Sequence, residues 1–163
     1  MQKKWMHTYM AVLIDTGIFF GYYSLKDEHH MDSVGIIVHA VEGKWGRIFI
    51  TNHILDETLT LLKYKKLPVE SFIKAFIDSK TIQVLNVDKD VELRALDLFR
   101  KNLYLKGFSF TDAVSETVAR DLDLIVLSYD SDFGVKTVGK DYWINLEEGE
   151  QKRIISLIHS HKV

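Results

Sequence analysis

The stretch Ala11-Val12-Leu13-Ile14-Asp15 decides the fold that we expect for this chain. Four apolar residues in a row predict a buried strand, and the acid that follows them marks its end. The same run is too short for a signal-peptide core or for a membrane-spanning helix. We therefore expect an intracellular, cytoplasmic protein whose sheet begins at Ala11.

Further strands and helices alternate along the rest of the chain. The predicted strands are Arg47–Thr51, Ile82–Val87, Leu124–Leu127 and a last one at Tyr142–Leu146. The predicted helices are Asp32–Glu42, a helix capped by Asn52 that runs through Tyr64, a helix from Pro68 to about Asp78, Asp90–Asn102, Thr111–Leu122 and Glu147–His159. Strands separated by helices indicate an α/β fold with a mostly parallel sheet.

The composition of the whole chain supports an ordinary globular core and excludes several kinds of site. Its 163 residues are 47% hydrophobic and include no cysteine. Disulfides, thiolate catalysis and Cys-based zinc or iron–sulfur sites are therefore excluded. The net charge of −2 lacks the positive excess that is usual in nucleic-acid binders, so the composition leaves that class of partner open.

Two acidic residues fall where such a sheet should place a ligand site. Asp15 closes the first predicted strand, and Asp130 follows the strand Leu124–Leu127. In parallel α/β sheets ligands bind beyond the carboxyl ends of the strands, so both acids should lie at that edge. Taken singly, each acid has a plainer interpretation as the cap of the next helix or as a turn residue.

Two more acids lie on predicted helices. Glu57 lies three residues after Ile54 and four before Leu61, which places it beside the apolar face of its helix. A carboxylate there needs a cation or a donor, unless it is a solvated edge residue. Asp112 also has a structural alternative, because Ser109 and Asp112 match the capping-box pattern and an acid in the first turn suits the helix dipole.

The four acids together favour a metal site over four unrelated caps and turns. The set comprises Asp15, Glu57, Asp112 and Asp130. All four can face one edge of a parallel sheet, where close carboxylates raise one another's pKa and a cation is their natural partner. An all-oxygen site suits Mg²⁺ or Mn²⁺ rather than zinc or copper, and these ions serve phosphodiester cleavage.

On these residues the chain resembles the PIN-domain family, and most closely its VapC-type toxins. The resemblance runs from about Ala11 to Leu146 and rests on short blocks in a fixed order. The blocks are Leu13-Ile14-Asp15-Thr16-Gly17, Ile54-Leu55-Asp56-Glu57-Thr58-Leu59, Phe108-Ser109-Phe110-Thr111-Asp112-Ala113 and Val126-Leu127-Ser128-Tyr129-Asp130-Ser131-Asp132-Phe133.

The resemblance implies a three-layer α/β/α fold that binds Mg²⁺ or Mn²⁺ and hydrolyses single-stranded or loop RNA. The metal-binding and catalytic acids would be Asp15, Glu57, Asp112 and Asp130. Asp132 would be an outer or second-metal ligand, and Thr16 and Ser128 would orient carboxylates or the attacking water. The implied partners are the RNA substrate, a small antitoxin protein and a second copy of the chain in a homodimer.

Two features depart from the family pattern. Gly17 stands where family members often carry Ser or another polar residue. The tail of residues 147–163 extends beyond the usual compact toxin. We therefore expect one domain over residues 1–163, with a core of about 11–146 and a C-terminal helical extension at 147–163 that is either an oligomer contact or an extra packing helix.

Histidines and lysines offer further sites, but plainer interpretations suffice for them. His29 and His30 precede a helix, and we expect local polar contacts there rather than metal ligation. A basic cluster at the end of a predicted helix could touch a phosphate backbone, although a solvated helix end is the favoured interpretation. This cluster consists of Lys63, Tyr64, Lys65 and Lys66.

Other functions compete with the nuclease. A haloacid-dehalogenase-like phosphatase needs a second Asp two residues after the first, where this chain has Gly17. A receiver domain needs paired early acids and a lysine after a late strand, and neither is evident. A catalytically silent PIN-like module that binds RNA or protein would keep the fold without turnover. The sequence leaves open whether a nuclease of this kind would be a toxin or an RNA-processing enzyme.

Overall fold

A five-stranded parallel sheet organises the structure. In this computed structural model, residues 11–161 are described. The strands lie in the order β3-β2-β1-β4-β5, and every neighbouring pair is parallel. Their bounds are β1 Ala11–Ile14, β2 Arg47–Thr51, β3 Gln83–Leu85, β4 Ile125–Leu127 and β5 Thr137–Val138. The predicted parallel sheet is confirmed except for its last strand, and β1 lies at its centre.

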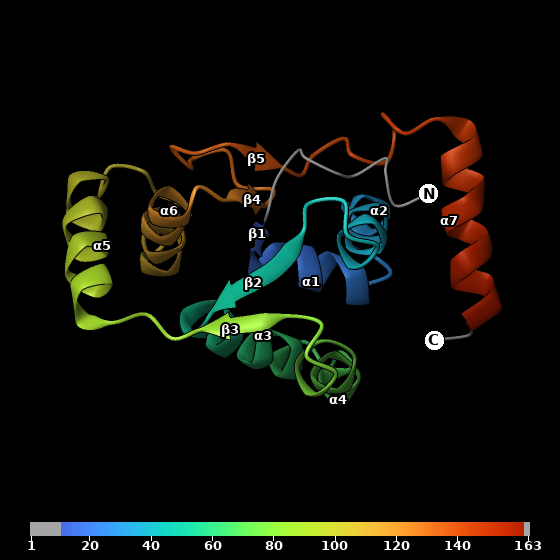
Figure 1. The fold of residues 1–163 in the computed structure, drawn as a ribbon, viewed down its shortest axis with the longest axis horizontal. Helices are drawn as coiled ribbons and strands as arrows, with labels where there is room; N and C mark the ends of the chain where they lie inside the picture. Colours follow the sequence, from blue (N-terminus) through green and yellow to red (C-terminus); the bar gives the residue numbers. More distant parts are fainter. Residues whose placement is uncertain (1–10, 162–163) are drawn as a thin grey trace.

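Helices cover both faces of this sheet and make three layers. The bounds are α1 Thr16–Tyr23, α2 His30–Val41, α3 Asn52–Tyr64, α4 Val69–Phe72, the π-helix η2 Ile73–Asp78, α5 Lys89–Lys101, α6 Phe110–Leu122 and α7 Glu148–His161. Helix α1 packs against α2 and α3, whereas α5 packs against α6. The chain moves from β1 to β3 in one direction and returns to β4, so right-handed crossovers put α5 and α6 on the opposite face from α1 to α4 (Figure 1).

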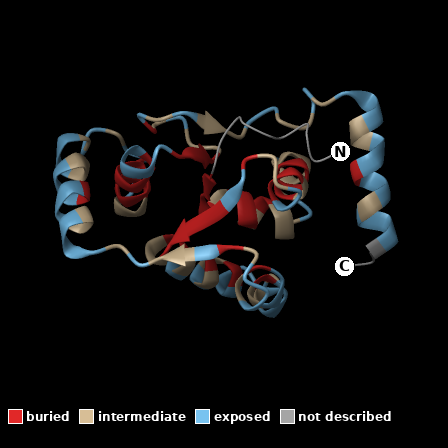
Figure 2. Cartoon of the chain, in the orientation of Figure 1, coloured by how far each residue is buried: buried red, intermediate tan, exposed pale blue. Residues whose placement is uncertain are grey.

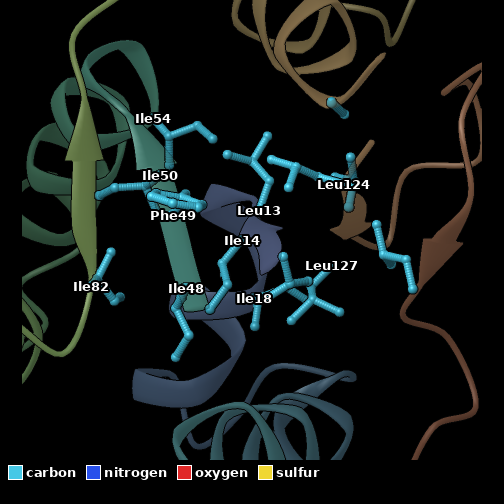
Figure 3. Packing of buried hydrophobic residues seen from close by; sticks show 14 of the residues in the cluster. Leu13, Ile14, Ile18, Ile48, Phe49, Ile50, Ile54, Ile82, Leu124 and Leu127 are labelled. Carbon is cyan, nitrogen blue, oxygen red and sulfur yellow. The ribbon is translucent and has the colours of Figure 1, made fainter. Parts of the chain in front are cut away.

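The core lies around the central strand. All four residues of β1 are buried, as are the three residues of β4. Leu13 and Ile14 of β1 pack with Ile50 of β2 and Leu127 of β4 (Figure 3). Because helices cover both faces, these strands are continuous apolar runs rather than alternating ones. Figure 2 shows buried residues at the centre of the molecule and mostly exposed ones on the outer faces of α5 and α7.

Helix α1 was not predicted from the sequence. Its residues, Thr16–Tyr23, are apolar on nearly every side, so they carry no helical periodicity. The helix packs between α2 and α3, which explains this composition. Asp15 is its N-cap: the carboxylate accepts a hydrogen bond from the Thr16 backbone N–H.

The prediction of a last strand at Tyr142–Leu146 was wrong. These residues form turns, and the fifth strand is instead Thr137–Val138, a two-residue pairing with β4. A strand this short lacks a sequence pattern that sets it apart from a loop. The segment is bound to α2 instead, since the Trp143 backbone N–H donates to the Asp32 carboxylate at 2.9 Å.

Two predicted helix starts also differ in detail. Thr51, not Asn52, caps α3 by accepting a hydrogen bond from the Ile54 N–H at 3.1 Å. The Asn52 side chain instead accepts from the Val87 N–H and fixes the chain after β3. Pro68 precedes α4 as its cap residue rather than being its first helical residue, and the helix continues as η2 to Asp78.

Helix α7 is attached to α2 through a buried polar network. His39 of α2 is 1% exposed and contacts the Tyr142 hydroxyl through Nδ1. Its Nε2 bonds Glu150 of α7 at 2.8 Å, and Arg153 of α7 bonds both carboxylate oxygens of Glu42. None of the helices between residues 11 and 161 combines the length and apolar character needed to cross a membrane.

Gly139 follows β5 at a position where a side chain has no room. A Cβ there would lie 2.0 Å from the Ser128 carbonyl oxygen. We predict that Gly139→Ala lowers the free energy of unfolding by roughly 1–3 kcal/mol, because β5 must move away from β4. The matched control is Gly149→Ala in α7, where a Cβ would meet no atom within 4 Å. Equal urea midpoints for the two variants would contradict this account of the β4–β5 contact.

Candidate active site

Asp15 lies at the carboxyl end of the central strand and is held in a fixed orientation. Its side chain is 8% exposed. One carboxylate oxygen accepts from the Thr16 N–H at 2.9 Å, and the other accepts from the Ser128 hydroxyl at 2.7 Å. Burial, together with the charges of Glu57 and Asp130, raises the pKa of Asp15 to about 6, although the two hydrogen bonds act to lower it.

Asp112 comes from the other face of the sheet, in the first turn of α6. The predicted capping box is confirmed: Ser109 Oγ accepts from the Asp112 N–H, and the Asp112 carboxylate accepts from the Ser109 N–H at 2.9 Å. Burial raises the pKa of Asp112 to about 7, and the charges of Asp15 and Asp130 contribute. The capping interpretation and the clustering of the acids therefore both hold for this residue.

Asp130 is bound to the same serine as Asp15. Its backbone N–H donates to Ser128 Oγ at 3.0 Å, while that hydroxyl donates to Asp15. Ser128 therefore fixes the spacing between the end of β1 and the loop after β4. The Asp130 carboxylate accepts from the Asp132 N–H at 2.9 Å, which closes a tight turn.

Glu57 reaches the cluster from α3. Its side chain is exposed, as expected for an edge position, and its charge acts on Asp15. The next residue, Thr58, is fully buried and donates to the Thr16 hydroxyl at 3.1 Å. This bond ties α3 to the start of α1, so the helix that carries Glu57 is held beside the end of β1.

Asp132 is placed differently from the other acids. Its Oδ2 lies 3.5 Å from the position that a Cβ of Gly107 would occupy, so the side chain is directed toward the loop between α5 and α6. Electrostatic coupling among the acids instead links Asp15 with Glu57 and Asp130, and Asp112 with Asp15 and Asp130. The structure thus places Asp15 within electrostatic reach of Glu57, Asp112 and Asp130.

The chemistry of this donor set fits a hard divalent cation. Burial raises the pKa of Asp15 and of Asp112 most, and the like charges beside them add to the rise; a bound cation would favour the charged carboxylates and oppose that shift. Oxygen ligands of this kind suit Mg²⁺ or Mn²⁺. Within residues 11–161, no three acid, His or Cys side chains are gathered closely enough to hold an ion as they stand.

Glu116 is a site-supporting residue that sequence reasoning missed. It lies one helical turn after Asp112 and is 3% exposed. Its carboxylate accepts from the Gly134 N–H and from Arg120, so it anchors the loop that follows Asp130 onto α6. The signal was present in the sequence as acids at 112 and 116 with an arginine at 120, which share one face of a helix.

Tyr129 is a second residue that the sequence did not single out. Its hydroxyl bonds Ser33 Oγ at 2.6 Å, and its ring stacks on His29 with centroids 4.1 Å apart. These contacts hold the α1–α2 connection against the end of β4. The expectation that His29 makes local polar contacts is confirmed, since its Nδ1 bonds Asp32 at 3.1 Å.

Comparisons with known proteins agree with this geometry. The PIN-domain family model matches residues 12–137. A curated relative, "VapC ribonuclease" from Archaeoglobus fulgidus, is 61% identical over 149 residues, which cover 91% of this chain and 96% of that protein.

Solved structures share the fold at low identity. VapC20 of Mycobacterium tuberculosis, described as a sarcin–ricin loop cleaving toxin, has a TM-score of 0.66 at 24% identity over 78% of this chain and 98% of that one. VapBC2 of Rickettsia felis, bound to promoter DNA, has a TM-score of 0.58 at 13% identity over 81% and 100%. FitAcB of Neisseria gonorrhoeae has a TM-score of 0.58 at 13% identity over 78% and 96%. With the family match spanning most of the chain and a relative of this identity, the chain belongs to the PIN-domain family.

Proposed function

We propose that this protein is a metal-dependent endoribonuclease that hydrolyses RNA phosphodiester bonds and acts as the toxin of a toxin–antitoxin pair. The proposal rests mainly on the group of interacting carboxylates at the carboxyl edge of a parallel sheet. Two of them, Asp15 and Asp112, are buried and have a raised pKa. The curated relative is named a VapC ribonuclease, which supports the same reaction.

Each residue of the site has a role in this proposal. Asp15, Glu57, Asp112 and Asp130 hold Mg²⁺ or Mn²⁺, and Asp132 contributes through water or to a second ion. When bound, such an ion supplies a water nucleophile at neutral pH and stabilises the charge that develops on phosphate oxygens. Ser128 and the Thr16 N–H fix the Asp15 carboxylate. A carboxylate oxygen of this set that the ion leaves free would accept the proton of the attacking water.

The alternative is a PIN-like module that binds RNA or protein without turnover. Burial of the charged carboxylates of Asp15 and Asp112 destabilises the fold, because they lose hydration; their raised pKa reflects this cost. A module without turnover gains nothing from keeping this arrangement, so we favour the enzyme.

Cytoplasmic location, a homodimer and the division into a core and a C-terminal extension stay predictions.

Cleavage of a mixed pool of structured RNAs tests the proposal. We predict metal-dependent cleavage with Mg²⁺ or Mn²⁺, its loss with a chelator, and a rate lowered more than about 100-fold in Asp15→Asn and Glu57→Gln, because each removes a ligand charge. The matched control is Asp56→Asn, whose side chain is exposed on the same helix as Glu57; it should stay within about 3-fold of the parent. Cleavage that survives both site variants would contradict the assignment, and a folded protein without cleavage under either metal would favour the module without turnover.

An apolar groove offers a place for the antitoxin. It has a volume of about 600 Å³ and is lined by α1, α2, α4, η2 and α7, with Tyr23, Val41, Phe76 and Leu157 among its residues. It opens at the end of α1 away from Asp15. A solved structure of this fold from Klebsiella pneumoniae is described as a toxin–antitoxin complex, and VapBC2 of Rickettsia felis is described as bound to a DNA fragment from its promoter. We infer that an apolar segment of a small antitoxin binds in this groove.

A charge placed in the groove tests this inference. Val41 is 52% exposed inside the groove, and Leu93 is 56% exposed on α5 outside it. We predict that Val41→Glu weakens binding of the proposed small antitoxin by about 10-fold or more, because a carboxylate must be desolvated against apolar surface. Leu93→Glu should leave the affinity unchanged in the same calorimetric titration. Equal affinities for the two variants would place the partner elsewhere.

A further inference from the structure

The loop of residues 102–109, which joins α5 to α6, lies directly beside the acids. Its last residue, Ser109, forms the capping box with Asp112. Gly107 lies against the Asp132 carboxylate, and the ring of Phe108 contacts that of Phe133 at 6.3 Å between centroids. One end of the loop is thus fixed to both the start of α6 and the segment after β4. This end of the loop therefore lies beside the carboxylates, and Tyr104 precedes Gly107 by three residues.

The tip of this loop exposes apolar side chains. Leu103 is 65% exposed and Tyr104 is 78% exposed, although Phe108 is buried and Leu105 packs against the core. Single exposed apolar residues are common on protein surfaces, so exposure alone decides little. Here, however, an aromatic ring stands free on an anchored loop next to the site where RNA must bind.

The charged side chains of the loop itself and of the end of α5 that leads into it are all positive. From Leu98 to Thr111 the chain contains no acid, and it contains Arg100, Lys101 and Lys106. Lys101 pairs with Asp97 at 2.9 Å, whereas Arg100 and Lys106 make no ion pair with the residues that the structure describes. A cluster of carboxylates repels a nucleic-acid backbone, so cations at its rim are needed to hold the substrate.

We propose that this loop binds single-stranded RNA next to the scissile phosphate. Tyr104 stacks on an unpaired base, and Lys106 with Arg100 contacts the neighbouring phosphates. Base stacking requires an exposed base face, which paired strands do not offer, so the loop selects single strands and loops of folded RNA. The inference deepens the proposed nuclease function by naming the residues that recognise its substrate.

A second aromatic and basic cluster, Lys63 to Lys66 at the end of α3, fits this role less well. Tyr64 is also 78% exposed, but Lys65 already lies over its ring at 5.7 Å. Helix α3 begins at the edge of the sheet that holds the acids and runs away from it, so its last residue is distant from the site. This cluster provides matched control residues of equal exposure and similar composition.

RNA binding without cleavage tests the proposal. In the Asp15→Asn background, the affinity for fluorescein-labelled single-stranded RNA of mixed sequence is measured by anisotropy. We expect Tyr104→Ala to weaken binding by about 10-fold and Tyr104→Trp to preserve it, because an aromatic face remains. Lys106→Gln should reduce the dependence of binding on salt by about one phosphate contact. Tyr64→Ala and Lys66→Gln should bind like the Asp15→Asn parent.

The outcomes separate this inference from the proposed function. Binding that is insensitive to Tyr104→Ala, binding that falls only with Tyr64→Ala, or no RNA binding by the Asp15→Asn chain would each overturn the role of the loop. Cleavage by the chain with intact acids is measured in parallel, where Tyr104→Ala should raise KM and leave kcat within about 3-fold. Loop-dependent binding without any cleavage would support the loop and reject the nuclease, whereas cleavage with an unchanged KM would reject the loop alone.

Discussion

The burial of the Asp15 carboxylate at the end of β1 is the constraint on which the rest of the structure depends. The strand is central in the sheet and covered on both faces, so its last side chain is held where water has little access. The same carboxylate caps α1 and accepts a hydrogen bond from the hydroxyl of Ser128, the residue that follows β4. The sheet, the first helix and the loop after β4 therefore meet at one ionisable group.

Desolvation outweighs hydrogen bonding at this group. The rise in the pKa of Asp15 from 3.8 to about 6 remains after both hydrogen bonds have acted, and it corresponds to roughly 3 kcal/mol against the charged form. Because the folded state binds this proton more tightly than the unfolded state, folding stability is highest below pH 4 as far as this group decides it. It falls as pH rises to about 6. Because the pKa of Asp112 is raised to about 7, this residue extends the fall in folding stability up to about pH 7. A divalent cation would offset the repulsion of the ionised carboxylates. Metal binding would therefore restore folding stability at neutral pH.

The parts of the fold and site that were predicted correctly rest on local chemistry. The apolar run before Asp15, the strand before Asp130 and the Ser109–Asp112 capping box each have one structural solution, so their places followed from the sequence. Helix α1 was missed because its surroundings, not its periodicity, make it a helix. Strand β5 was misplaced because a two-residue pairing depends on where β4 lies. The role of Glu116 was missed because it depends on a tertiary contact: the loop at Gly134 folds back onto α6 and donates to the Glu116 carboxylate.

Proton release on metal binding tests most directly the claim that a cation completes the carboxylate cluster. Mg²⁺ is titrated calorimetrically into the protein in two buffers of different ionisation enthalpy, at about pH 6.5 and again at about pH 8.5. With pKa values of about 6 for Asp15 and about 7 for Asp112, both groups carry protons in part at the lower pH. We therefore predict net proton release at the lower pH and close to none at the higher one. Mg²⁺ binding without proton release at the lower pH, or no Mg²⁺ binding at either pH, would contradict the account.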